Sequence, residues 1–114
     1  MTETRKDFEQ RRDRGNEFVL SSASLTTRRF FALDHDAYAA GALSTKTKEL
    51  LGLTASTVLR CNDCIAYHLT EATACGATRE EIGEALEIAL IVGGSITIPH
   101  LRFAFEFFEG LKES

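Results

Sequence analysis

The segment from residue 79 to residue 92 carries apolar side chains on nearly every side of a helix. Thr78 and Glu81, three positions apart, form the capping-box pattern that begins a helix, and the glycine pair at 93–94 ends it. One side of this helix holds Ile82, Ala85, Leu86, Ala89 and Leu90, and its other sides hold Ile88 and Ile91. A helix that is apolar all round must be covered all round.

A chain of 114 residues has few other helices with which to cover such a segment. The last segment adds more apolar surface that must be covered, because four phenylalanines fall between residues 103 and 108. We therefore expect a homo-oligomer in which neighbouring subunits supply the missing cover. A compact monomer with a large apolar core is the alternative.

Helical spacing of apolar residues also dominates the rest of the chain. The expected segments are a helix or frayed arm over 4–20, a helix over 25–40 that stops at Gly41, a helix capped by Ser44 and running to about residue 59, a helix with two cysteines that ends at Gly76, and a last helix with Pro99 near its start. No stretch alternates apolar and polar residues well enough to predict a strand. The fold class is therefore all-α, as one domain over residues 1–114 with its core at about 25–111.

Charge and hydropathy exclude two classes of partner. The formal net charge is -4, and no basic stripe is present, so we expect no nucleic-acid partner. Residues 1–15 lack the apolar core of a signal peptide, and no apolar run approaches the roughly 20 residues that span a bilayer. We expect no membrane partner and a cytoplasmic location, where cysteines are normally kept reduced.

The candidate chemistry lies in a C-x-x-C-x-x-x-H motif formed by Cys61, Cys64 and His68. At about 100° per residue, the three side chains fall within an arc of roughly 60° on one helix face. A helix N-terminus and a nearby imidazole both favour the thiolate, which is the reactive form of cysteine. A thiolate oxidised to a sulfenic acid condenses with a neighbouring thiol to a disulfide. The motif therefore favours thiol redox chemistry.

Two other interpretations of the motif remain open. A structural zinc site needs four ligands, so the three side chains would have to recruit His100 or another subunit. Alternatively, the cysteines are buried structural residues. Cys75 is too far along the helix to join the cluster, and we expect it in the core near the helix end. His35 is expected on the surface, and His100 is a weak candidate for lining a pocket.

These residues resemble the carboxymuconolactone decarboxylase superfamily, in its alkylhydroperoxidase D-like branch. The resemblance covers about residues 42–104. The matching pieces are Ala42-Leu43-Ser44, Lys46, Lys48-Glu49-Leu50, the Cys61, Cys64 and His68 motif, Gly76-Ala77-Thr78, Glu80-Glu81-Ile82, Glu84-Ala85 and Gly93-Gly94.

The resemblance implies an alkylhydroperoxidase D-like helical bundle of about five to six helices that assembles into a trimer or hexamer. It also implies a peroxidase that reduces hydroperoxides through a dithiol–disulfide cycle, without a cofactor or a metal. The electrons would come from a dithiol reductant, a lipoamide- or thioredoxin-like adaptor.

The resemblance further implies the role of each site residue. Glu49, twelve residues before Cys61, would join His68 in a proton relay, although the residue alone would be taken for a surface acid. Cys64 would attack the peroxide and Cys61 would resolve. Helix-dipole reasoning alone favours Cys61 as the nucleophile, but His68 is one turn from Cys64 and two from Cys61. This chain departs from the pattern at Asp63, where alkylhydroperoxidase D has histidine; an anion pointing inward there would raise thiol pKa values.

Two alternative functions follow from the same residues. One is a decarboxylase-type lyase acting on a small lactone acid, but that chemistry needs proton transfer and no dithiol. The other is a non-catalytic oligomeric module that uses the motif to bind zinc or a partner.

Overall fold

Helices are the only regular elements of the computed structural model, which describes residues 3–112. In chain order they are α1 (Arg5–Ser22), α2 (Leu25–Ala37), α3 (Thr45–Val58), α4 (Asn62–Ala74), α5 (Arg79–Gly93), the 3-10 helix η1 (Ser95–Thr97) and α6 (Ile98–Lys112). The predicted all-α class is confirmed. None of these helices is long and apolar enough to cross a membrane.

Local capping signals place most helix ends where the sequence predicts them. The hydroxyl of Ser44 accepts a hydrogen bond from the backbone N–H of Thr47 at 3.1 Å and begins α3. Thr78 and Glu81 form both hydrogen bonds of the capping box that begins α5. Gly76 follows α4 with φ at +88°, a left-handed conformation that glycine adopts without strain.

The second helix is shorter than predicted, because α2 ends at Ala37 rather than near residue 40. The ammonium of Lys48 donates hydrogen bonds to the carbonyl oxygens of Ala37 and Ala39, at 3.0 and 2.6 Å. A side chain from α3 therefore caps the C-terminal end of α2.

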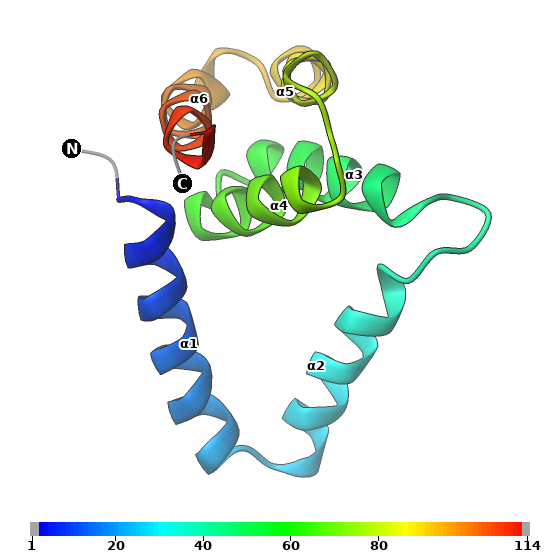
Figure 1. Cartoon of the computed structure of the whole chain (residues 1–114), viewed down its shortest axis with the longest axis vertical. Coiled ribbons are helices and arrows are strands. Elements are labelled where there is room, and N and C mark those ends of the chain that lie inside the picture. Colours follow the sequence, from blue (N-terminus) through cyan, green and yellow to red (C-terminus); the bar gives the residue numbers. More distant parts are fainter. Residues whose placement is uncertain (1–2, 113–114) are drawn as a thin grey trace.

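The core lies between two helical layers (Figure 1). Helix α3 packs against α4 and α5, and α4 also packs against α6. The fully buried apolar side chains include Leu53, Ile65, Leu69, Ile82 and Leu86.

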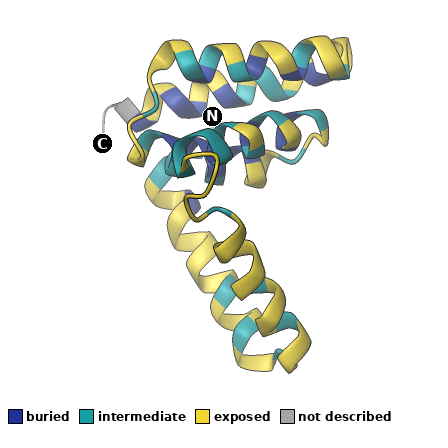
Figure 2. Ribbon diagram, turned by 90° about the vertical axis from the view of Figure 1, so that its right-hand side faces the viewer, coloured by how far each residue is buried: buried dark blue, intermediate teal, exposed yellow. Residues whose placement is uncertain are grey.

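Helices α1 and α2 form a V-shaped arm that extends away from the other helices (Figure 1). Figure 2 shows that the arm is exposed over most of its length. Helix α2 buries no residue, and α1 buries only Phe8, whose ring meets that of Phe107 edge to face at 5.9 Å. Phe8 is therefore the apolar anchor of the arm.

The expectation that Cys75 is a core residue is wrong, since its side chain is exposed. Eleven residues after Cys64, it lies about 20° from Cys64 around the helix axis. The buried His68 lies on the same face, but residues 74–76 at the end of α4 are all exposed. Helical spacing places Cys75 on the face of His68 but does not tell where along the helix the cover from other helices ends.

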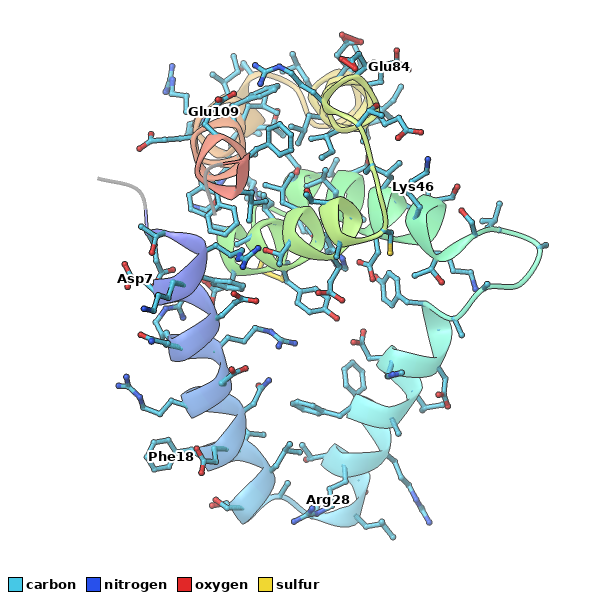
Figure 3. All side chains as sticks on the ribbon, viewed as in Figure 1. Asp7, Phe18, Arg28, Lys46, Glu84 and Glu109 are labelled. Atoms are coloured by element: carbon cyan, nitrogen blue, oxygen red, sulfur yellow. A yellow bond between two sulfur atoms is a disulfide. The ribbon has the colours of Figure 1, made fainter. Side chains whose placement is uncertain are left out.

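We predict that Phe8→Ala lowers the free energy of unfolding by about 3–5 kcal/mol, the usual cost of emptying a buried phenylalanine site. Phe18→Ala on the same helix is the matched control. The Phe18 ring is 71% exposed and points outward from α1 (Figure 3), so its loss should change stability by no more than about 0.5 kcal/mol. Urea denaturation at one protein concentration measures both. Equal losses would show that α1 is not anchored through Phe8.

Candidate active site

A tight turn between α3 and α4 places Cys61 at the start of α4. Arg60 adopts a left-handed conformation, with φ at 61°. Its N–H donates to the carbonyl of Thr57, and that of Cys61 donates to the carbonyl of Ser56, both at 3.0 Å. This pair of hydrogen bonds is the Schellman pattern that ends a helix. The chain therefore passes from the end of α3 directly to the N-cap of α4.

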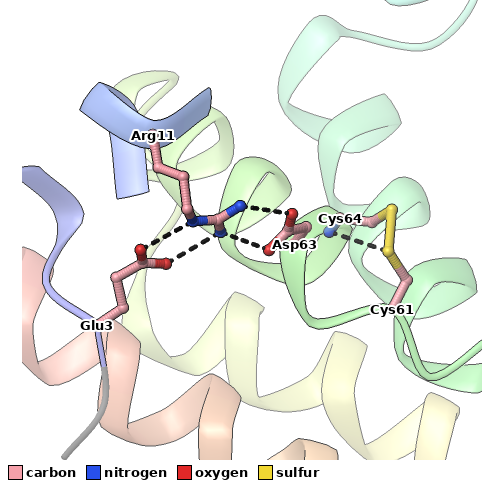
Figure 4. A network of polar contacts seen from close by, with 5 residues as sticks. All are labelled: Glu3, Arg11, Cys61, Asp63 and Cys64. Carbon is pink, nitrogen blue, oxygen red and sulfur yellow. Dashed lines mark hydrogen bonds and ion pairs between the residues drawn. A yellow bond between two sulfur atoms is a disulfide. The ribbon is translucent and has the colours of Figure 1, made fainter. Parts of the chain in front are cut away.

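Cys61 and Cys64 are joined by a disulfide across the first turn of α4, as Figure 4 shows. Their Cα atoms are 5.3 Å apart, within the range that disulfides require. The sulfur of Cys61 is the N-cap acceptor and receives a hydrogen bond from the N–H of Cys64 at 3.3 Å. Cys61 is half-buried and Cys64 is exposed, so a molecule from solvent meets Cys64 first.

Glu49 of α3 and His68 of α4 lie side by side in the interior. Oε1 of Glu49 is 2.7 Å from Nδ1 of His68, and the two residues are only 3% and 8% exposed. An ionised carboxylate only accepts hydrogen bonds, so Nδ1–H donates and Nε2 is left to exchange a proton with another group. The residue pattern alone places Glu49 on the surface; the structure instead brings it against His68.

Gly52 makes room for the imidazole and was missed by the sequence analysis. A Cβ at this position would lie 2.6 Å from Cε1 of His68 and 2.8 Å from both ring nitrogens. Only glycine permits this approach. The available signal was a glycine inside a helix, where it costs up to about 1 kcal/mol, placed three residues after Glu49 and thus on the same face.

Two tyrosines flank the imidazole of His68. The ring centroids of Tyr38 and Tyr67 are 5.4 and 5.2 Å from that of His68. Burial raises the pKa of Tyr38, and the negative charges of Glu49 and Asp34 raise it further. Burial also raises the pKa of Tyr67, as do nearby carboxylates including Glu49. Both phenols therefore stay protonated and neutral beside the imidazole.

Asp63 is directed toward α1 rather than toward the sulfurs. Its carboxylate accepts two hydrogen bonds from the guanidinium of Arg11, at 2.7 and 3.1 Å (Figure 4). Arg11 also binds Glu3, and hydrogen bonds to Glu3 and Asp63 raise the pKa of the guanidinium. The anion that would oppose thiolate formation is thus neutralised by a fixed cation.

Cys64 and His68 lie on the wall of one cavity of about 470 Å³ between the arm and α4. Its other lining residues are Phe8, Arg11, Arg12, Gly15, Asn16, Val19, Asp34, Asp63 and Tyr67. Helix α1 supplies most of these, although no motif in its sequence indicates a part in the site.

Glu49 lies on the wall of a neighbouring cavity of about 360 Å³, which shares Arg12, Asp34 and Tyr67 with the first. The exposed His35 also lines this second cavity, and its predicted surface position is confirmed. His100 does not line the cavity that holds Cys64; its Nδ1 is 2.8 Å from Oδ1 of Asn62. Within residues 3–112, no three His, Cys, Asp or Glu side chains converge to hold a metal ion.

Two solved structures resemble this one closely. The Thermotoga maritima protein TM1620 superimposes with a TM-score of 0.93 at 59% identity, over 95% of each chain. A second crystal structure of TM1620 (TM-score 0.89, 57% identity, 93% of this chain and 90% of that one) is described as a carboxymuconolactone decarboxylase family protein for which an antioxidative response has been suggested. Legionella pneumophila lpg0406, of the same family, gives a TM-score of 0.75 at 30% identity, over 91% of this chain and 89% of that one.

Sequence comparison leads to the same family. Cupriavidus necator protein H16_B0147 is 31% identical over 72 residues, which are 63% of this chain and 64% of that protein's length. The profile of the Carboxymuconolactone decarboxylase family matches residues 25–107, which is most of the chain. The chain belongs to the carboxymuconolactone decarboxylase family, as the motifs in its sequence predict.

Proposed function

We propose that this chain is a thiol-dependent peroxidase that reduces hydroperoxides through a dithiol–disulfide cycle of Cys61 and Cys64. The observation that carries the proposal is that Cys64 and His68 line the same cavity, while the carboxylate of Glu49 is hydrogen-bonded to the imidazole of His68. Because a thiol is nucleophilic only as its thiolate, a base one helical turn away is what the first step needs.

In that step, Nε2 of His68 accepts the proton of the Cys64 thiol. The thiolate sulfur attacks the terminal oxygen of the hydroperoxide; an S–O bond forms, the O–O bond breaks, and Cys64 becomes a sulfenic acid. The leaving alkoxide takes the proton from the imidazolium and departs as an alcohol. Glu49 acts through His68, because its hydrogen bond fixes the tautomer and its charge stabilises the imidazolium.

In the second step, the Cys61 thiol attacks the sulfenic sulfur of Cys64, an S–S bond forms and water leaves. An external dithiol then reduces this disulfide by two exchange steps and is itself oxidised to a disulfide. We propose a lipoamide- or thioredoxin-like adaptor as this reductant, and the cytoplasm as the compartment that keeps it reduced.

Two further observations favour this activity over the reaction that gives the family its name. Decarboxylation of a lactone acid needs no dithiol, whereas this site places two sulfurs on one helical turn. An antioxidative response has also been suggested for a relative that is 57% identical.

We predict that one equivalent of hydroperoxide converts the reduced chain to a form with an intramolecular Cys61–Cys64 disulfide. Mass spectrometry should register the loss of two hydrogens in the peptide that holds both residues. Cys61→Ser should stop at a sulfenic acid on Cys64 that dimedone traps, and Cys64→Ser should not react. Cys75→Ser is the matched control and should behave like the parent. A disulfide that includes Cys75 would contradict the cycle.

We predict that His68→Ala slows oxidation of Cys64 by about 10²–10⁴-fold, the usual contribution of a general acid–base group. Glu49→Gln keeps the shape and removes the charge, so it should slow the reaction less than His68→Ala. The losses should be strongly non-additive in the double variant, because both changes disable one unit. Rates measured across pH for all four proteins provide the test. An unchanged rate in Glu49→Gln would leave a simpler Cys64–His68 pair.

We also propose that the chain assembles into a homo-oligomer, a trimer or a hexamer. The surface of α5 and η1 supports this, because large apolar side chains there lie open in the isolated subunit. They are Ile88 (56% exposed), Ile91 (80%), Val92 (69%) and Ile96 (56%). An apolar patch of this kind marks an interaction site.

Light scattering at micromolar concentration should therefore give a mass several times 12.6 kDa. Ile91→Glu should lower that mass, because it places a charge in the proposed contact. Glu84→Lys is the control on the same helix, at an exposed position that points away from the other helices (Figure 3). A parent protein of 12.6 kDa in solution would rule the assembly out.

A further inference from the structure

The cavity beside Cys64 is much larger than the simplest peroxide. Its volume is about 470 Å³, within the range of pockets that hold organic ligands, whereas hydrogen peroxide has only two heavy atoms. The walls include the apolar surfaces of Phe8, Val19 and Tyr67. A pocket of this size and lining suits an organic molecule that buries an apolar body.

Two neighbouring arginines of α1 line this cavity, and only one of them forms ion pairs within residues 3–112. Arg11 is occupied by Asp63 and Glu3, as described above. Arg12 has no ion-pair partner among the residues that the structure describes. Its guanidinium lies over the ring of Tyr67, 4.4 Å from the centroid. A guanidinium that lies over an aromatic ring still has N–H groups that can donate to a carboxylate.

Arg12 lies close to the two residues that would react with the peroxide. The Tyr67 ring on which Arg12 lies is itself 5.2 Å from the ring of His68, and Cys64 lines the same cavity. Arg12 also lines the neighbouring cavity, but Cys64 lies only on the wall of the first. An anion bound at Arg12 in the first cavity would leave the rest of its molecule beside Cys64 and His68.

Asp34 of α2 is the opposing charge. It lines the same cavity as Arg12, and the structure records no ion pair between them. Asp34 would repel an anion from the α2 side and so favour its binding on the α1 wall. The third polar side chain of the α1 wall, Asn16, is neutral.

We propose that the preferred substrates are organic hydroperoxides that carry a carboxylate, and that Arg12 binds the carboxylate while the peroxide lies at Cys64. This inference rests on the proposed peroxidase function. The chemistry at sulfur is that given above; Arg12 adds only selection among peroxides.

The test compares two probes that differ in one charge, 4-(2-hydroperoxypropan-2-yl)benzoic acid and its methyl ester, with hydrogen peroxide as a third substrate. The readout is kcat/KM for oxidation of Cys64 in the reduced full chain. The parent should prefer the acid over the ester by about 10- to 100-fold, the range expected for a hydrogen bond to a charged group. The difference should lie mainly in KM.

Arg12→Gln should lower the acid-to-ester ratio to about one, and Arg12→Lys should retain part of it. Asp34→Asn should raise the ratio, because it removes the repulsion. Arg14→Gln is the matched control, since Arg14 is an exposed arginine of the same helix that does not line this cavity. Circular dichroism checks that each variant is folded.

A ratio near one in the parent, or a ratio that Arg12→Gln does not change, would overturn the inference while leaving the peroxidase in place. Failure of all three peroxides to oxidise Cys64 in the parent would instead overturn the proposed function, and the inference with it.

Discussion

The hydrogen bond between Glu49 and His68 is the contact on which the site depends. A buried carboxylate is costly unless it is paired, and here the partner comes from the neighbouring helix. The pair therefore fixes the register of α3 against α4 from within. Gly52 completes this arrangement, because any side chain there would displace the imidazole. The same contact that joins the two helices also holds the imidazole one turn from Cys64.

Helix α1 supplies the positive charges near the sulfurs. It packs against α4, although the two helices are far apart in the sequence. Arg11 pairs with Asp63 and so keeps an anion from acting on the thiols. Arg12, one residue later, lies on Tyr67 beside the imidazole. A single turn of α1 thus supplies Arg11, which is paired with Asp63, and Arg12, which lines the cavity without an ion-pair partner among the described residues. Helix α1, which buries only Phe8, therefore supplies the positive charge beside the site.

Features that depend on neighbouring residues could be predicted from the sequence, whereas contacts between distant segments could not. The caps at Ser44 and Thr78 were predictable because their hydrogen bonds span three residues. The burial of Glu49 was predictable only through the family resemblance, since it depends on a partner 19 positions away. The Arg11–Asp63 pair spans 52 positions and left no local pattern. Cys75 was misplaced because helical spacing groups residues on a face without telling where along the helix that face stops being covered.

Cys61 has two roles at the start of α4. As the N-cap of α4 it accepts the N–H of Cys64, so its sulfur is held over the first turn. A sulfur in that place is already beside Cys64, and the Cα separation of 5.3 Å suits a disulfide. The Schellman turn at Arg60 fixes where α4 begins and hence which residue is the cap. The proposed cycle would therefore find the two cysteines already on one helical turn, at a Cα separation that suits the disulfide.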